Sequence, residues 1–566
     1  MKFRQWLNWL LCTSFAWQTV VAFELNISSL DSIYSGIETV QKGLIDYWNA
    51  STDSFTRSYW WQTGSSLTTM LNTMLVTNNE TYKSLIHDAL VYNAGEDYNY
   101  QPSSEYFNLG NDDQGFWALA AMSAAENDFT SPDSSRSWLE LTQTVFNLQV
   151  ARWDINSCEG GLRWQAFPWL SGYTYKNSIS NGLLFQLSAR LARFSENETY
   201  AEWAEKIWDW SEYVGFVNTT DYSVYDGSYI TNNCSVLNLR QWTYNLGVYL
   251  AGSAYMYNYT NGSDTWKGRL DGLITKSNYF FVENIAQDPQ CEYFNNCNLD
   301  QTSFKGILIR FFGYAMQLAP YTHDTLMPLV QGSAVAAALA CSGGYDGVTC
   351  GTHWSWNNGT WDSTYGVGQQ GAALDAINTL LIDYAPTPKK LSSVSDQRSD
   401  PSAGVHTHGT TVNVTITPAT ESDRGGAGFL TALTIAIFLL GSIWAVFDFG
   451  GSGKLPARNE PYVTFISILR PSSDEDEKYK SVDSSDTGNS SREKADATGV
   501  EEAKQSDTAI ISPSSPVAKR SDASLSTLQN PTHPIESNSN TSFSNLSDDS
   551  QKLSDAPNHG NADRVL

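Results

Sequence analysis

The sequence has few basic residues: 34 Lys and Arg stand against 60 Asp and Glu, which gives a formal net charge of −26. A nucleic-acid-binding protein needs a basic face, so we expect no nucleic-acid partner. Cysteine and histidine spacings typical of zinc sites are missing, and we predict neither a metal nor a cofactor. The alternation of apolar and polar residues that marks β-strands is also scarce. The sequence therefore predicts a mainly helical, acidic protein.

The N-terminus predicts secretion. Lys2 and Arg4 are followed by an apolar stretch that ends in Val20-Val21-Ala22. This order is typical of a signal peptide that is cleaved after small residues. We therefore assign residues 1–22 to a secretory signal peptide.

A second apolar segment predicts membrane attachment. Residues 427–447, AGFLTALTIAIFLLGSIWAVF, form an uncharged run that as a helix would cover about 30 Å, the hydrocarbon thickness of a bilayer. Lys454 and Arg458 follow it, which favours a cytoplasmic C-terminus. A lipid-anchor signal would have to end the chain, whereas residues 448–566 follow here. We predict a single-pass type I protein of the cell membrane, with its N-terminal part outside the cell.

Composition divides the remainder of the chain. Residues 23–386 are rich in Trp, Tyr and Phe and predict one large folded domain. Residues 387–426 are rich in Ser, Thr and Pro, which is typical of an extended stalk. Residues 448–566 contain few aromatic residues and many Ser, Asp and Asn. Such a segment cannot bury enough apolar surface to fold, so we predict a disordered acidic cytoplasmic tail.

Six cysteines remain once Cys12 leaves with the signal peptide, and all of them lie in the large domain. An even number of cysteines in a secreted domain predicts disulfides. Short separations favour two pairs and leave a third: Cys291–Cys297, Cys341–Cys350 and Cys158–Cys234. Many N-glycosylation sequons in the same domain support an extracellular surface and a glycoprotein.

The large domain has the pattern of helical hairpins, with apolar residues at three- and four-residue spacing. A weak repeat of about 60 residues sets an aromatic or apolar residue behind a helix cap. Twelve helices are predicted, at 29–48, 63–77, 79–92, 111–127, 133–152, 177–195, 198–215, 238–259, 262–281, 302–319, 322–341 and 364–384. Six hairpins of this size suit a closed α-toroid of inner and outer helices. An open solenoid is the alternative.

The predicted connections alternate in length. Tight turns join each inner helix to the next outer one, and long loops rich in Gly, Trp, Tyr and Asn lead into the inner helices. If these loops gather on one face, they build an aromatic-rimmed pocket suited to sugar rings. The segment GVGQQG, residues 366–371, fits a dinucleotide-binding pattern but lacks a preceding apolar strand. We interpret it as the glycine-rich start of a pocket helix.

Two adjacent carboxylates, Asp112 and Asp113, stand in YFNLGNDDQGFWALAAMSAAEN, residues 106–127. Helix capping would explain one acid at this place. Two close carboxylates repel each other, however, and the pKa of one of them should rise. An ionised and a protonated carboxyl group roughly 5–5.5 Å apart are what a retaining glycosidase needs. Neighbouring Cα atoms about 3.8 Å apart permit that spacing.

The segment NDDQGFWALAAMSAAE resembles the catalytic segment of glycoside hydrolase family 76, and is most similar to its fungal cell-wall branch, the Dfg5/Dcw1-type endo-1,6-α-mannosidase-like proteins. Further matches follow in family order: YKNSISNGLLFQLSARLAR, VYDG, QWTYNLGVYLAG, FKGILIRF and GVGQQGAALDA. The resemblance covers residues from about 30 to 385. It implies an (α/α)6 barrel and a retaining mechanism, with Asp112 as nucleophile and Asp113 as general acid/base.

The resemblance also implies a substrate, which is mannan or the mannose core of GPI-anchored wall proteins during fungal cell-wall assembly. Hydrolysis and transfer to a wall β-glucan acceptor both remain open. Candidate substrate-binding residues are Trp117, Arg163, Trp164, Asn177, Asp226, Tyr244, Asn245, Lys305 and Arg310. For Lys305 and Arg310, an ion pair on the helix is an equal alternative. The alternative function is a catalytically silent glycan-binding or wall-sensor membrane protein with a signalling tail.

Overall fold

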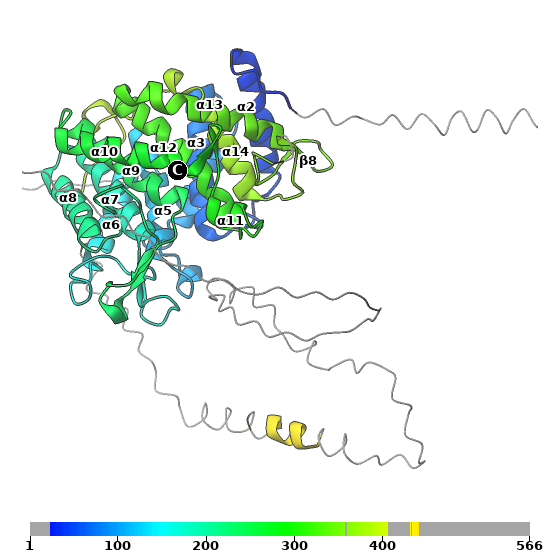
Figure 1. Cartoon of the computed structure of the whole chain (residues 1–566). Helices are drawn as coiled ribbons and strands as arrows, with labels where there is room; N and C mark the ends of the chain where they lie inside the picture. The colour runs from blue at the N-terminus through cyan, green and yellow to red at the C-terminus, as the bar shows by residue number, and fades with distance from the viewer. Residues whose placement is uncertain (1–22, 357–358, 406–430, 432, 441–566) are drawn as a thin grey trace, which may run out of the picture. The chain divides into compact units, whose positions relative to one another are not determined.

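The computed structural model describes residues 23–356, 359–405, 431 and 433–440 (Figure 1). These residues are mainly helical, which confirms the expected all-α class. The predicted signal peptide, the predicted tail and most of the apolar segment 427–447 lie outside them. Within the described part of the chain, no helix combines the length and the apolar character needed to cross a membrane.

Six helices pack side by side and close a ring. They are α3 (Trp60–Thr77), α5 (Asn111–Glu126), α7 (Ser178–Ser195), α9 (Thr243–Tyr259), α12 (Phe304–Leu318) and α14 (Val367–Thr379). Each packs on the next in this order, and α14 packs on α3. Nearly every residue of these helices is buried, because each has neighbours on several sides. Their many Ala, Gly and Ser residues allow this close packing.

Six further helices cover the outside of this ring. They are α2 (Leu30–Ile45), α4 (Lys83–Asn93), α6 (Trp138–Ala151), α8 (Glu198–Tyr213), α10 (Asp264–Ser277) and α13 (His323–Ala340). Each packs on one or two ring helices, and α2, α8, α10 and α13 are at the periphery in Figure 1. The repeat seen in the sequence marks the start of five of them, at Tyr82, Trp138, Tyr200, Trp266 and Leu326.

The long loops lead into the ring helices, as predicted, and carry the short strands. The antiparallel pairs are β1 (Trp48–Asn49) with β2 (Ser54–Phe55), β6 (Phe281–Val282) with β7 (Ile285–Ala286), and β8 (Cys341–Gly343) with β9 (Thr349–Cys350). A three-stranded sheet joins the loops before α7 and α9 through β3 (Tyr175–Asn177), β4 (Gly227–Tyr229) and β5 (Leu237–Asn238). The short helix α11 (Pro289–Glu292) precedes α12. Neighbouring loops are therefore tied together at the end where the ring helices begin.

Three disulfides lie in these loops and confirm the predicted pairing. They join Cys158 to Cys234, Cys291 to Cys297, and Cys341 to Cys350. The first links the loop before α7 to the loop before α9, so it joins two loops that are far apart in the sequence.

Residues 387–405, here called the C-terminal strap, pack on the helical domain. Lys389 N donates a hydrogen bond to Glu126 O (2.9 Å), and Leu139 N donates one to Gln397 Oε1 (3.2 Å). Gln397 is buried beside α6. The expected boundary at residue 386 was therefore placed too early, and the first part of the predicted stalk belongs to the folded domain. Its polar composition suggested an extended chain, whereas its amides and carbonyls find partners on α5 and α6.

Candidate active site

Asp112 and Asp113 lie in the first turn of α5 and are the two residues of that helix that are not buried. Gly110 N donates a hydrogen bond to Asp113 Oδ2 (2.7 Å), and Asp113 N donates one to Asp112 Oδ1 (3.1 Å). Asp113 thus caps the helix, as the simpler interpretation expected. The positive end of the helix dipole also favours a negative charge here.

The helical period decides where Asp112 points. Asp112, Ser123 and Glu126 lie on one stripe of α5, because Ser123 follows Asp112 by about three helical turns and Glu126 follows it by about four. Arg190 of α7 donates hydrogen bonds to Ser123 Oγ (2.9 Å) and to Glu126 Oε2 (2.6 Å), so this stripe faces the inside of the ring. Asp112 is therefore at the entrance of the ring, and Asp113 is about 100° further around the helix.

The carboxyl groups of Asp112 and Asp113 both lie close to Gly110, where a side chain would crowd them. A Cβ atom at this position would overlap Asp112 Oδ1 and would lie 2.8 Å from Asp113 Oδ2. The backbone φ of Gly110 is −86°, which any residue can adopt. A larger residue would therefore have to displace these two side chains. The two carboxyl groups therefore flank the same small residue.

A third carboxyl group, that of Glu105, is close to this pair. Burial, and then the negative charge of Asp113, raise the pKa of Glu105. Sequence reasoning missed this residue, although an acid seven positions before an acidic pair was a visible signal. Three carboxyl groups thus gather at the entrance of α5.

The loop before α7 lies alongside the segment that leads into the aspartate pair. Asn111 N donates to Trp164 O (2.8 Å), and Asn111 Nδ2 donates to Arg163 O (2.9 Å). Two candidates, Arg163 and Trp164, are therefore beside α5 although they are about 50 residues away in the sequence. The Arg163 guanidinium pairs with Asp154 (2.7 Å) and lies over the ring of Tyr173.

Two other candidates lie at the three-stranded sheet. Asn177 is the last residue of β3, and Asp226 directly precedes β4. Asn177 caps α7 by accepting a hydrogen bond from Ser180 N (3.2 Å). Asp226 accepts hydrogen bonds from Tyr175 Oη (2.6 Å) and Trp242 Nε1 (3.1 Å), and burial raises the pKa of its carboxyl group. Both side chains hold loops together, so the structure shows them in a supporting position.

Tyr244 and Asn245 open the ring helix α9. Tyr244 is half-buried and stacks on Phe304 of α12, with ring centroids 3.6 Å apart and planes 6° apart. Asn245 is 1 % exposed, and its side-chain amide has no hydrogen-bond partner among the described residues. A buried unpaired amide is unfavourable, so this position calls for a polar partner.

The remaining candidates are buried within the protein. Lys305 pairs with Glu292 (3.0 Å), and Arg310 pairs with Asp375 (3.5 Å), which agrees with the ion-pair alternative for both. Trp117 is fully buried and stacks on Tyr100. These three side chains have protein partners, and none of them is exposed at the entrance.

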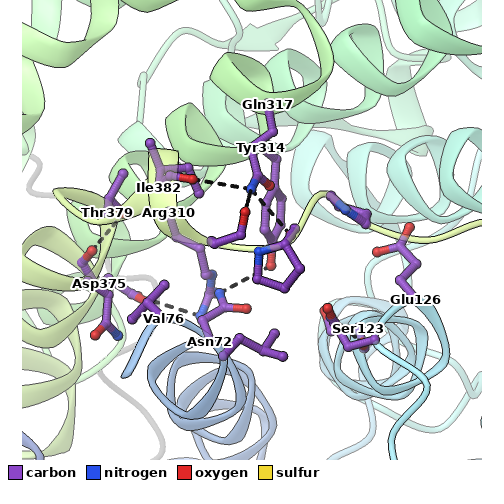
Figure 2. A pocket seen from close by; sticks show the side chains of 16 residues that line it. Asn72, Val76, Ser123, Glu126, Arg310, Tyr314, Gln317, Asp375, Thr379 and Ile382 are labelled. Carbon is purple, nitrogen blue, oxygen red and sulfur yellow. Dashed lines mark hydrogen bonds and ion pairs between the residues drawn. The ribbon is translucent and has the colours of Figure 1, made fainter. Parts of the chain in front are cut away.

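A small cavity with apolar and polar lining lies at the other end of the ring (Figure 2). Its volume of about 40 Å³ has room for a few water molecules and not for a sugar. Its lining includes Glu126, Arg310, Tyr314 and Asp375, and burial raises the pKa of Asp375 to about 6. Glu126 ends the helix that Asp112 begins, about 21 Å away. The cavity is therefore remote from the aspartate pair.

Among the described residues, no group of three or more His, Cys, Asp or Glu side chains is arranged to hold a metal ion. Paired carboxyl groups at the open end of a helical ring have instead the composition of a glycoside hydrolase site. The model of glycosyl hydrolase family 76 matches residues 32–392, and the chain belongs to this family.

Relatives from fungi are similar over nearly their whole length. A Schizosaccharomyces pombe protein with the provisional name mannan endo-1,6-alpha-mannosidase is 52% identical, over 74% of this chain and 95% of its own. The mannan endo-1,6-alpha-mannosidase DFG5 of Candida albicans is 42% identical, over 76% of this chain and 96% of its own. The crystal structure of Dfg5 from Chaetomium thermophilum in complex with glucosamine is 35% identical, with a TM-score of 0.65 over 69% of this chain and 99% of that one.

Proposed function

We propose that the protein is a retaining, endo-acting α-1,6-mannosidase or transglycosidase of the fungal cell wall, built on an (α/α)6 barrel. The observation that carries the proposal is the aspartate pair at the ring entrance in a chain 42% identical to a named mannan endo-1,6-alpha-mannosidase. The closed order of ring helices supports the barrel assignment. Mannan or the mannose core of a GPI anchor is the proposed substrate.

The proposed mechanism uses the two aspartates in different roles. The Asp112 carboxylate, on the inward stripe of α5, attacks the anomeric carbon and forms a glycosyl ester. The bond from that carbon to the leaving oxygen breaks, and Asp113 gives its proton to this oxygen. Asp113 then takes a proton from an incoming hydroxyl, whose oxygen displaces Asp112 and restores the original anomeric configuration.

The nature of the incoming hydroxyl separates hydrolysis from transfer. Water gives hydrolysis, whereas a sugar hydroxyl, such as one on a β-glucan, gives transglycosylation. Around this centre we propose that Trp164, Tyr244 and Asn245 contact the substrate. Trp164 and Tyr244 are half-buried next to ring entrances, and the unpaired Asn245 amide would gain a partner from a sugar hydroxyl.

We further propose that a signal peptide and the apolar segment 427–447 place this domain outside the cell, facing the wall, with residues 448–566 inside. Charge and apolar length support this topology. Protease treatment of intact cells should spare a tag placed after Leu566. Release of the protein by a phospholipase specific for lipid anchors would contradict the topology.

The enzymatic proposal is tested with full-length protein in detergent and defined oligomannosides. We expect internal cleavage of α-1,6-linked chains and not of α-1,2- or α-1,3-linked chains. The first product observed by NMR should have the α-configuration, because two displacements retain it. Binding of α-1,6-mannosides without any cleavage or transfer would favour the silent glycan-binding alternative.

A further inference from the structure

Four aromatic residues form an exposed patch on the loops before α5 and α7. This aromatic platform consists of Tyr106, Phe107, Phe167 and Trp169. Phe107 is 78% exposed and Trp169 is 51% exposed. An exposed Trp that stacks on a partly exposed Phe leaves apolar surface in water, which is typical of a binding surface.

The indole of Trp169 is held in one orientation. Its ring stacks on Phe167, with centroids 4.8 Å apart and planes 5° apart. Trp169 Nε1 donates a hydrogen bond to Tyr106 O (3.2 Å), and the Tyr106 ring packs edge-on against Phe167. One face of the indole is thus covered from behind while the side chain stays half exposed. Such a rigid surface loses little entropy when a ligand binds.

The platform is joined to the aspartate pair through the backbone. Ala166 N donates to Leu109 O (3.0 Å), and Gly110 and Gln165 form an antiparallel bridge. Asp112 follows Gly110 by two residues, and Trp169 follows Gln165 by four. The two halves of the platform therefore rise from the pair of strand-like segments that ends at the catalytic carboxyl groups.

The chemistry of the platform selects its occupant. A flat indole face offers no charge and matches the C–H face of a pyranose ring, in the way aromatic rings pack on flat apolar groups. Protein partners need about 800 Å² per side, far more than four side chains present. An endo-acting enzyme holds a polymer on both sides of the bond that it cuts, so chain must extend across the rim.

We propose that the aromatic platform is a subsite for the α-1,6-mannan chain, beyond the two sugars that flank the cleaved bond. The assignment rests on the proposed function. It adds that Trp169 decides how strongly the enzyme prefers long mannan chains to short ones. Trp169 is a binding residue in this view and takes no part in proton transfer or bond breaking. Short substrates do not reach it, whereas long ones stack on it.

The test compares full-length wild type with Trp169→Ala, Trp169→Phe and Tyr384→Ala. Tyr384 is a matched control, because it is 64% exposed and follows α14 at the other end of the ring. We expect Trp169→Ala to raise KM about tenfold for long α-1,6-mannooligosaccharides, with unchanged kcat and unchanged kinetics on the shortest cleaved substrate. Trp169→Phe should keep part of the preference for long chains, and Tyr384→Ala should match wild type.

A second measurement does not depend on turnover. In the Asp112→Asn background, Trp169→Ala should weaken calorimetric binding of long α-1,6-mannosides about tenfold and leave short ones unchanged. Equal affinities with and without Trp169 would overturn the platform while leaving the proposed function intact. Dependence on Trp169 for β-1,3-glucan oligosaccharides alone would also overturn it, because the occupant would then be the acceptor. Cleavage that fails at every chain length would count against the proposed function instead.

Discussion

The two ends of the helical ring treat charge in opposite ways. At the end where α5 finishes, Glu126 pairs with Arg190 (2.6 Å), and both side chains are at most 2% exposed. At the end where α5 begins, two carboxyl groups of like charge, Asp112 and Asp113, are adjacent and half-buried. One helix therefore carries a charge-balanced buried pair at one end and a self-repelling pair at the other.

The difference separates stability from function. A buried ion pair is tolerated only when each charge has its partner, and loss of one partner leaves an uncompensated charge in the interior. Adjacent carboxyl groups offer no comparable gain, because each disfavours ionisation of the other. The pair at the end where α5 finishes, here called the closed end, must therefore keep both of its charges, whereas the aspartate pair at the entrance has the arrangement that the proposed mechanism uses.

The largest effect is expected on the cleavage rate when either aspartate at the entrance is replaced. Asp112→Asn and Asp113→Asn should each lower the rate of cleavage of α-1,6-mannosides by about 10³-fold or more, because each removes the proposed nucleophile or the proposed acid/base. Thermal unfolding should stay near wild type, since Asn also caps helices. The control is Asp97→Asn, which replaces an exposed residue in the loop between α4 and α5 and should keep full activity. Normal turnover by folded Asp112→Asn and Asp113→Asn would reduce the pair to a helix cap.

The next largest effect is expected when the ion pair between Glu126 and Arg190 at the closed end is broken. Arg190→Met should lower the free energy of unfolding by about 3–5 kcal/mol, because Glu126 would remain buried without its partner. The double variant Arg190→Met with Glu126→Leu should recover much of this loss, because no charge is left unpaired. Denaturant unfolding measures both variants. Equal stability of the single and double variants would contradict this prediction, because it would show that a buried Glu126 without Arg190 does not lower the free energy of unfolding.

A third prediction tests the crowding of the two carboxyl groups. Gly110→Ala adds a Cβ that overlaps Asp112 Oδ1, so the carboxyl groups must shift, and kcat should fall by about 10²-fold. Gly268→Ala on α10 is the matched control, because a Cβ there has no neighbouring atom within 4 Å. That control should keep its kcat. Unchanged kcat in Gly110→Ala would mean that the carboxyl positions tolerate displacement.

The smallest effect concerns pH at the closed end. Burial raises the pKa of Asp375 from its ordinary value of 3.8 to about 6, although Arg310 opposes the rise. A raised carboxyl pKa contributes stability that is fully present below about pH 4 and is lost as the pH rises through about 6. The unfolding free energy of wild type minus that of Asp375→Asn should therefore be larger at pH 4.5 than at pH 7. A difference that does not change with pH would contradict the assignment, and Asp97→Asn is again the control.

Much of the fold could be predicted because it follows from local patterns. The helix expected at 111–127 is found at Asn111–Glu126, since its cap residues and apolar run lie within one stretch of chain. The same holds for the two disulfides that close loops of fewer than ten residues, and these two leave Cys158 and Cys234 as the third pair. The aspartate pair could be proposed as the site because its neighbours in the sequence carry the family pattern.

Partners at long range could not be predicted in the same way. The charge of Arg310 predicts contact with the substrate, but Arg310 donates hydrogen bonds to Ser65, 245 residues earlier, and pairs with Asp375. Lys305 was chosen on the same ground and is buried against Glu292. The Ser/Thr/Pro-rich start of the predicted stalk packs on α6, because Ser137 and Gln143 supply hydrogen-bond partners.

The amino-acid sequence by itself determined where most helices lie to within a few residues, that two of the disulfides close short loops, and that two carboxyl groups are neighbours, because each of these depends on contacts within a few residues. Only the tertiary structure decided which face of α5 looks into the ring, which charges are buried with a partner, and that the loop of Trp169 pairs with the segment leading into the aspartate pair. Those outcomes depend on how segments 50 to 250 residues apart come together, since the closure of the ring gives each side chain its surroundings.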